Sequence, residues 1–170
     1  MSEARIAERV ARESYGRLLA LLAARTRDVA AAEDALADAF AAALTAWPHT
    51  GAPDNPEAWL FAAARRKLID AARRAKTAAF GEAEIVRGIE ELEAEMNAEK
   101  APDHRLGLMF ACAHPTIDEN VRTPLMLQAV LGFSAERIAA AFLVEPSAMG
   151  QRLVRAKKKI RDAGVGFDVP

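Results

Sequence analysis

The last stretch of the sequence predicts a helix with two chemically distinct sides. At 100° per residue, one side collects the apolar residues Met149, Leu153, Ala156 and Ile160. The opposite side holds hydrogen-bonding and cationic groups, namely Ser147, Gln151, Arg155 and Lys158. Three more cations flank that polar side, namely Arg152, Lys159 and Arg161. Glutamine and arginine can bond base edges, and cations can neutralise phosphates, so the pattern indicates noncovalent recognition of duplex DNA.

That recognition requires a second helix just before the last one. Gly132 fits a helix C-cap, and Ser134 can cap a helix over 135–142, which a tight connection over 143–146 joins to the last helix. This is the helix-turn-helix arrangement, whose second helix enters the major groove. The alternative is a surface amphipathic helix whose basic face is only solvated. Gly150 inside the last helix should cost roughly 1 kcal/mol relative to alanine, and close backbone approach to DNA would compensate.

A second basic segment runs from residue 62 to residue 76, where the only acid is Asp70. Its cations are Arg65, Arg66, Lys67, Arg73, Arg74 and Lys76. Separating DNA strands needs a surface that captures unstacked bases and neutralises a single strand. Trp59 and Phe61 supply aromatic rings for such a surface, next to the first three cations. The alternative for Trp59 is a position in the hydrophobic core. We favour the core position for Trp47, because Trp47 continues an apolar stripe.

Charge is segregated along the chain. The 170 residues carry a net charge of -1, which taken globally argues against a nucleic-acid binder because counterion release needs a basic surface. Locally, the basic segments 62–76 and 147–162 flank an acidic one, since 81–99 holds seven glutamates against Arg87. Each run alone is explained as well by a solvated helix face, but two basic runs in one short chain favour DNA-binding surfaces.

Composition and periodicity predict an all-α chain. Hydrophobic residues make up 52% of the sequence and aromatic residues only 6%, which favours helices packed through small and aliphatic side chains. One N-terminal stripe comprises Ile6, Val10, Leu18 and Leu22. A second comprises Val29, Ala32, Leu36, Phe40, Ala43 and Trp47. The second helix should end at Pro48, before a loop over 49–56, and a third should begin near Pro56.

The same periodicity divides the chain into two small helical domains, over 1–75 and 103–170. An acidic, partly helical linker over 76–102 joins them, because that segment lacks a sustained apolar stripe. In the second domain the helical pattern first resumes at Leu106, Met109, Phe110 and Ala113. It then returns over 119–131.

Other kinds of chemistry find little support. The single cysteine, Cys112, excludes an internal disulfide, and with His114 it lacks the second Cys/His pair of a tetrahedral metal site. Asp34 and Asp38 share one helix face, yet no histidine, phosphate loop or nucleophile motif accompanies them. We therefore expect no metal, no cofactor and no enzymatic activity. Neither a signal peptide nor a transmembrane stretch is indicated, so the expected location is the cytoplasm.

Three stretches, in this order, resemble conserved parts of the extracytoplasmic-function (ECF) group of sigma-70 family factors, which contain only the second and fourth conserved sigma regions. The region-2 helix that docks on the coiled coil of the polymerase β′ subunit is similar to AEDALADAF, residues 32–40. The following helix, which contacts and opens the −10 element, is similar to WLFAAARRKLIDAARR, residues 59–74. Region 4, which reads the −35 element, is similar to FSAERIAAAFLVEPSAMGQRLVRAKKKIR, residues 133–161.

The resemblance implies a sigma factor that directs promoter recognition and DNA opening. Its partners would be core RNA polymerase, through the β′ coiled coil and the β flap, and promoter DNA at the −10 and −35 elements, with no membrane. The polymerase-binding residues would be Glu33, Asp34, Asp38 and Phe40. The loop over 48–56 would pocket a flipped −10 base.

Further likenesses concern the subgroup. The stretches GAPDNPEAWL, FACAHP and GFDVP resemble a subgroup whose members usually continue into a C-terminal extension, which implies that this chain is shortened. Such an extension or an anti-sigma factor would be a further partner.

Two other classes of function stay open from the residues alone. A stand-alone helix-turn-helix regulator would bind an operator as a dimer without polymerase, and specific duplex binding by the isolated protein would favour it. A helical interaction protein without a DNA role would show binding that is insensitive to salt.

Overall fold

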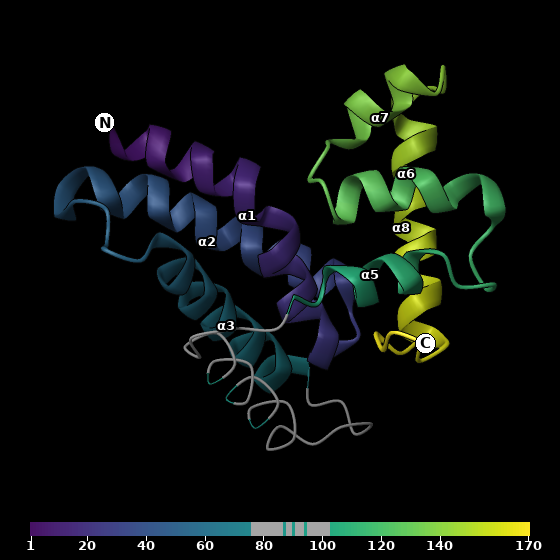
Figure 1. Cartoon of the computed structure of the whole chain (residues 1–170), viewed down its shortest axis with the longest axis horizontal. Helices are drawn as coiled ribbons and strands as arrows, with labels where there is room; N and C mark the ends of the chain where they lie inside the picture. Colours follow the sequence, from purple (N-terminus) through teal and green to yellow (C-terminus); the bar gives the residue numbers. More distant parts are fainter. Residues whose placement is uncertain (76–86, 88–89, 91–93, 95–102) are drawn as a thin grey trace.

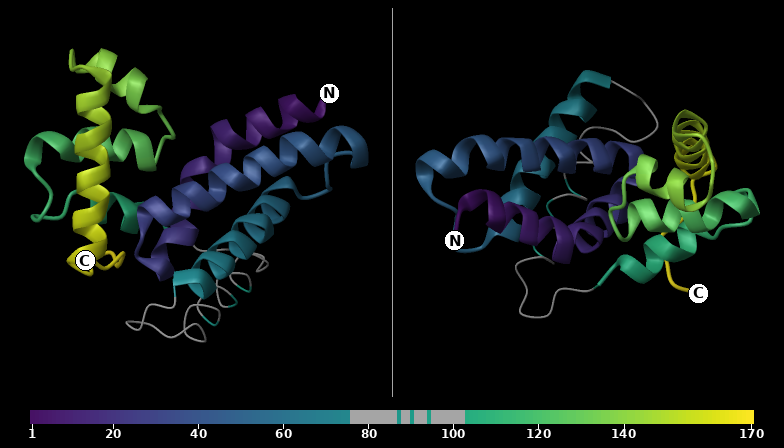
Figure 2. Two further views of the ribbon diagram at one scale, coloured as in Figure 1. Left: turned by 180° about the vertical axis from the view of Figure 1, so that it is seen from behind. Right: turned by 90° about the horizontal axis from the view of Figure 1, so that it is seen from above.

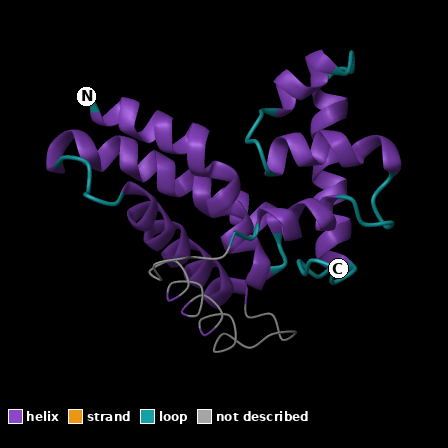
Figure 3. Ribbon diagram, in the orientation of Figure 1, coloured by secondary structure: helices purple, strands orange, loops and turns teal. Residues whose placement is uncertain are grey.

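The computed structural model describes residues 1–75, 87, 90, 94 and 103–170, so the predicted linker over 76–102 lies almost entirely outside the described residues. Within the described part, the chain is all-helical, with seven helices and no strand (Figure 3). This confirms the predicted fold class. None of the described helices combines the length and the apolar character needed to cross a membrane.

Three long helices form the N-terminal half: α1 (Glu3–Thr26), α2 (Val29–Thr50) and α3 (Pro56–Ala75), with α2 between the other two (Figure 1). Ser2 caps α1 by accepting a hydrogen bond from the Arg5 amide, and Asp28 caps α2 by accepting one from Ala31 at 3.0 Å. Between them, Arg27 adopts a left-handed conformation with φ 53°, which reverses the chain so that α2 folds back on α1.

The predicted stripes form the core of this half. Val10, Leu18 and Leu22 are buried on α1, and Ile6 packs against the core at its edge. The whole α2 stripe is buried except Phe40, which is partly buried. Because alanines occupy many of the α2 contact positions, α1 and α3 approach α2 closely.

The prediction that the second helix ends at Pro48 is wrong. The helix α2 continues to Thr50, and the connection to α3 spans only 51–55. Pro48 lacks a backbone donor, yet its fixed φ is compatible with helical backbone, and α2 ends two residues after it. The last turn is closed by the Gly51 amide, which donates to the Trp47 carbonyl at 2.8 Å, with Gly51 at φ 80°.

The C-terminal half contains α5 (Arg105–Cys112), α6 (Glu119–Ala129), α7 (Ala135–Ala141) and α8 (Pro146–Asp162). The Ser134 hydroxyl caps α7 by accepting from the Arg137 amide, as predicted. The predicted C-cap at Gly132 is corrected, because α6 ends at Ala129 with Val130 as its C-cap, and Gly132 follows in a left-handed conformation with φ 73°. The apolar side of α8 is buried at all four predicted positions. After α8, Val165 and Phe167 return to the core.

The predicted apolar face of α5 is corrected by the structure. Leu106, Met109 and Phe110 are exposed, whereas the buried side of this helix consists of Gly107, Leu108, Ala111 and Cys112. Gly107 faces inward because the Phe167 carbonyl passes so close that a Cβ there would lie 2.0 Å from its oxygen. An eight-residue helix gives too few turns for periodicity alone to choose between the two faces.

The two halves are packed against each other (Figure 2). Helix α1 contacts α5 and α6, and the N-terminal end of α2 lies beside α8. The buried side chains of both halves form one continuous hydrophobic cluster.

Candidate nucleic-acid and protein interfaces

A four-residue turn, 142–145, joins α7 to α8 and fixes where α8 begins. Leu143 takes a left-handed conformation with φ 55° and is 94% exposed, and the Val144 amide donates to the Ala139 carbonyl at 2.9 Å. Glu145 then caps α8 by accepting from the amides of Ser147 and Ala148. The Ser147 hydroxyl also donates to Glu145, and these bonds lower the pKa of the Glu145 carboxyl.

The polar side of α8 is solvent-exposed along its length. All the α8 residues predicted to contact DNA are exposed: Ser147, Gln151, Arg152, Arg155, Lys158 and Lys159. Arg155 Nε donates to the Gln151 carbonyl at 3.3 Å, and Lys159 Nζ lies 3.5 Å from Asp118. A cavity of about 320 Å³ opens between this side and the start of α6. Its polar lining consists of Asp118, Asn120, Arg152, Arg155 and Lys159.

Gly150 has open space where a side chain would be, since apart from its chain neighbours and the adjacent α8 backbone no described atom lies within 4 Å of the position that a Cβ would take. Replacing Gly150 by alanine should therefore raise the free energy of unfolding by roughly 1 kcal/mol, through the higher helix propensity of alanine. Chemical denaturation of both proteins measures this. An unchanged or lower stability would contradict the expectation that nothing within the chain requires glycine there.

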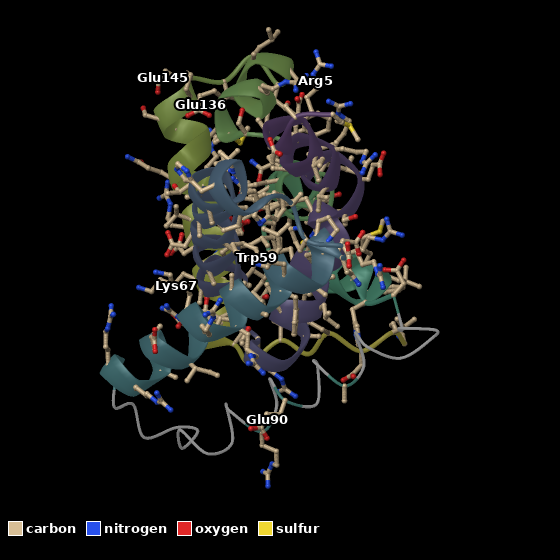
Figure 4. All side chains as sticks on the ribbon, turned by 90° about the vertical axis from the view of Figure 1, so that its left-hand side faces the viewer. Arg5, Trp59, Lys67, Glu90, Glu136 and Glu145 are labelled. Carbon is tan, nitrogen blue, oxygen red and sulfur yellow. The ribbon has the colours of Figure 1, made fainter. Side chains whose placement is uncertain are left out.

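The basic segment on α3 is held in place by its N-terminal turn. The Asn55 side chain accepts from the Ala58 amide at 3.1 Å, and Glu57 accepts from the Ser14 hydroxyl and from Arg17 Nη1, the latter at 3.0 Å. These bonds tie α3 to α1. The exposed cations of the segment are Arg66, Lys67, Arg73 and Arg74, while Arg65 is half-buried. Lys67 projects away from the helical core (Figure 4).

The aromatic residues next to this segment divide between surface and core. Phe61 is only 2% exposed, so its assignment to DNA contact is corrected: the ring fills the space between α3 and its neighbours. Trp59 is half-buried and meets the buried Trp47 edge-on, with ring centroids 5.3 Å apart. The core position favoured for Trp47 is confirmed, whereas Trp59 is only partly buried.

The acidic residues of α2 do not share one environment. Asp34 and Asp38 are exposed with Ala37 between them, and Phe40 is partly buried against the core. Glu33 is different, because Lys157 Nζ on α8 lies 2.6 Å from its Oε2. Lys157 is itself buried and also donates to Gln128 Oε1 on α6 at 3.0 Å.

Lys157 belongs by sequence to the basic segment 147–162, although the structure buries it. A signal was present in the sequence, since Lys157 follows Leu153 by four residues and precedes Ile160 by three, which places it at the edge of the apolar side. Burial raises the pKa of Glu33, an effect that Lys157 opposes. Burial, with Glu33 nearby, also raises the pKa of the Cys112 thiol to about 12.

The residues considered for a metal have other roles. His114 Nδ1 accepts a hydrogen bond from the Thr116 amide at 3.2 Å and shapes the connection between α5 and α6. Cys112 is buried. In the part of the chain that the structure describes, no three potential ligand side chains come together.

Comparison with known proteins gives a family for the N-terminal helices. Residues 10–77, from within α1 through α3, match the family described as Sigma-70 region 2. The exposed acids Asp34 and Asp38 of α2 and the basic segment of α3 both lie inside the match, whereas α8 lies outside it. In that family this region serves RNA polymerase binding and promoter melting.

A similar protein is also found over most of the chain. An uncharacterized protein of Rhizobium meliloti (strain 1021) is 36% identical over 149 residues, which cover 85% of this chain and 35% of that protein. The chain thus spans about a third of the length of the curated relative that it matches. No solved structure matches it.

Proposed function

We propose that this chain is a sigma factor of the ECF group, which binds core RNA polymerase, recognises promoter DNA and opens it at the start of transcription. The observation that carries this proposal is the Sigma-70 region 2 match over residues 10–77. It covers both an exposed acidic face on α2 and an exposed basic face on α3. The factor itself performs no catalysis, and it acts in the cytoplasm, where polymerase and DNA are found.

Docking on the polymerase uses the exposed acids of α2. Asp34 and Asp38 stand four residues apart on a rigid helix whose opposite side is buried, so their spacing is fixed before binding. Paired carboxylates in that geometry complement a basic surface, for which we propose the β′ coiled coil. Charge complementarity of this kind speeds association and selects the partner.

Promoter opening uses α3. A row of exposed cations faces a single strand, namely Arg66, Lys67, Arg73 and Arg74, and the partly buried Trp59 offers a ring for an unstacked base. Phosphate contacts hold the strand in register, and stacking compensates for part of the lost base stacking in the duplex. The loop over 51–55 lies at the N-terminal end of α3, next to Trp59, and is the place we propose for a flipped −10 base.

Recognition of the −35 element is assigned to α8 together with α7, as a helix-turn-helix unit. The support is the exposed face with Gln151 and Arg155 at its centre and cations at its edges. Only 27 residues separate Ala75 from Asp103, which is enough for a linker between regions 2 and 4. That spacing supports the ECF group over longer sigma factors.

Two substitutions on α8 should behave differently. Arg155→Ala removes a base contact, so it should cost roughly 1–3 kcal/mol and relax sequence preference at one −35 position. Lys159→Ala removes a phosphate contact, so it should weaken all sequences alike and make the salt dependence shallower. Promoter binding by the holoenzyme across a salt series separates the two. If neither variant changes promoter affinity or sequence preference, the polar side of α8 is only solvated and does not contact DNA.

The proposal as a whole is tested by mixing the purified chain with core RNA polymerase and separating complexes by size. A one-to-one complex is expected, and a saturating amount of primary sigma factor should displace the chain because both use the same docking surface. Failure to form any complex at low salt would rule the function out.

A further inference from the structure

The cavity of about 320 Å³ beside α8 lies where α6 crosses that helix (Figure 1). Three cations line it from α8, namely Arg152, Arg155 and Lys159, and their spacing of three and four residues places them on one side of the helix. From the start of α6, Asp118 supplies the one carboxylate among the lining residues that the structure describes. We call this cavity the α6–α8 pocket.

The charges around the α6–α8 pocket do not cancel. Three cations against one carboxylate leave the described lining with a net charge of +2, in a chain whose net charge is -1. Lys159 Nζ lies 3.5 Å from Asp118, and both side chains are about half exposed or more, so this ion pair is weak. Arg155 bonds only a carbonyl of its own helix, through Nε, and Arg152 makes no hydrogen bond or ion pair with another described residue. The two guanidinium groups therefore keep most of their donors for a ligand.

The inner wall of the pocket is apolar. Val121 and Ala156 line it, and both residues are buried. A hollow that has cations of one sign and a low-dielectric wall concentrates their electric field. An anion in the pocket is therefore held more tightly than an anion on a flat helix face. Asn120 adds an amide that can donate a further hydrogen bond.

Two guanidinium groups and one ammonium group match the chemistry of a phosphate. The guanidinium fork binds phosphate oxygens in pairs, and the ammonium adds a point charge. A phosphate monoester carries a charge of about −1.5 to −2 at pH 7, whereas a phosphodiester of the DNA backbone carries a single negative charge. The net charge of the lining therefore favours a monoester over the DNA backbone.

The space available is larger than a phosphate needs. A second hollow of about 520 Å³ adjoins the pocket along α8 and shares Arg155 and Lys159 with it. Its other polar lining residues are Thr116, Lys158 and Asp162. Sites for whole small molecules have volumes of roughly 300–1,000 Å³. A ligand could thus place its phosphate in the α6–α8 pocket and its polar body in the second hollow.

We propose that the α6–α8 pocket binds the terminal phosphate of a small phosphorylated metabolite, and that the bound ligand keeps α8 from DNA. The second half of this proposal rests on the proposed function, because Arg155 and Lys159 are also the residues proposed for a base contact and a phosphate contact with the −35 element. The same side chains cannot serve both partners at once. The ligand and the promoter therefore compete for α8.

The binding half is tested by calorimetric titration of the full chain near neutral pH, in a chloride buffer of fixed ionic strength. Three probes are compared: inorganic phosphate, AMP, and cyclic AMP, whose phosphate is a diester on the same nucleoside. We expect measurable binding of inorganic phosphate. AMP should bind about tenfold more tightly than cyclic AMP or better, because a diester lacks the second negative charge.

Three variants locate the bound phosphate. Arg152→Gln removes a guanidinium donor and should lower the affinity for AMP about tenfold. Asp118→Asn removes the carboxylate that repels the ligand and occupies Lys159, so it should raise the affinity for AMP about fivefold. Arg161→Gln is the matched control, since Arg161 is an exposed cation of α8 that lines neither hollow and pairs with its neighbour Asp162. This control should bind AMP as the wild type does.

Several results would overturn the binding half. Equal affinities for AMP and cyclic AMP would mean that the pocket accepts diesters and is a seat for the DNA backbone. Equal losses in Arg152→Gln and Arg161→Gln, or no gain in Asp118→Asn, would mean that the ligand is held by general charge and not in the pocket. If neither AMP nor inorganic phosphate binds at millimolar concentrations, the chain has no such site.

The competition half is tested with the holoenzyme and a labelled promoter fragment. AMP at about ten times its Kd should weaken promoter binding about tenfold, whereas cyclic AMP at the same ionic strength should not. The AMP concentration that halves promoter binding should be about tenfold higher for Arg152→Gln and unchanged for Arg161→Gln. If AMP binds the chain and leaves promoter affinity unchanged, the competition is refuted. A holoenzyme that binds no promoter even without AMP would refute the proposed function and the competition with it, while the titrations still decide the phosphate site.

Discussion

Reversing both exposed acids of α2, with Asp34→Lys and Asp38→Lys in one variant, is expected to weaken binding to core RNA polymerase by roughly 100-fold, or about 2.7 kcal/mol. Both side chains are solvent-exposed on a helix held by its buried face, so the change should leave the fold intact. The loss arises because two attractive contacts with a basic surface become repulsive. Fluorescence titration at low salt measures the affinity, and circular dichroism checks the helix content.

A control with the same change of charge isolates the position of those acids. Glu8→Lys with Glu13→Lys alters two exposed acids on α1, also within or near the sigma-70 region 2 match. The salt bridge from Glu8 to Arg12 is exposed and contributes little. This control should bind core within a few-fold of the wild type. Equal losses in the two double variants would mean that net charge, and not docking by α2, governs binding.

The second large effect concerns the core under α8, the helix proposed to read DNA. Leu153→Ala should lower the free energy of unfolding by roughly 2–5 kcal/mol, since Leu153 is fully buried and its removal leaves a cavity. The adjacent Val154 is 62% exposed, so Val154→Ala should change stability by no more than about 0.5 kcal/mol. Urea denaturation of the two variants gives both values. Similar costs for the two would contradict the assignment of α8 sides on which the DNA-binding surface depends.

Much of this architecture could be predicted because long helices average over many turns. On α2, six regularly spaced positions specify the core face, and on α8 the four apolar positions do the same. Local capping chemistry was equally readable at Ser134, which takes the N-cap position that its side chain indicates. These features depend on residues close together in sequence.

The errors fall where tertiary contacts decide. Phe61 looked available for DNA because aromatic and basic residues follow each other, yet packing of α3 on α2 turns it inward. On α5, Leu108 and Cys112 are buried in place of Leu106, Met109 and Phe110, because the returning chain at Phe167 requires a glycine on that side. The burial of Lys157 was not predicted for a similar reason, because its partner Glu33 comes from the other half of the chain.

Two kinds of observation support the proposed DNA and polymerase contacts. Contact with DNA or with polymerase requires exposed side chains, and the polar side of α8, Asp34 and Asp38 are all exposed. The region 2 match adds an independent reason for α2 and α3, whereas α8 depends on its residue pattern alone. A stand-alone regulator would use the same α8 surface without polymerase, so the dependence of DNA recognition on polymerase separates the two functions.

Selection of binding sites from a random DNA library tests the central claim most directly. The chain is used alone in one arm and together with core RNA polymerase in the other, and the bound DNA is sequenced. With polymerase, we expect two enriched blocks whose centres lie about 25 base pairs apart, as for −35 and −10 elements, and Arg155→Ala should blur one position of the upstream block only. Alone, the chain should enrich no such pair. Enrichment of one inverted-repeat site by the isolated chain, unchanged when polymerase is added, would identify a stand-alone regulator and contradict the sigma function.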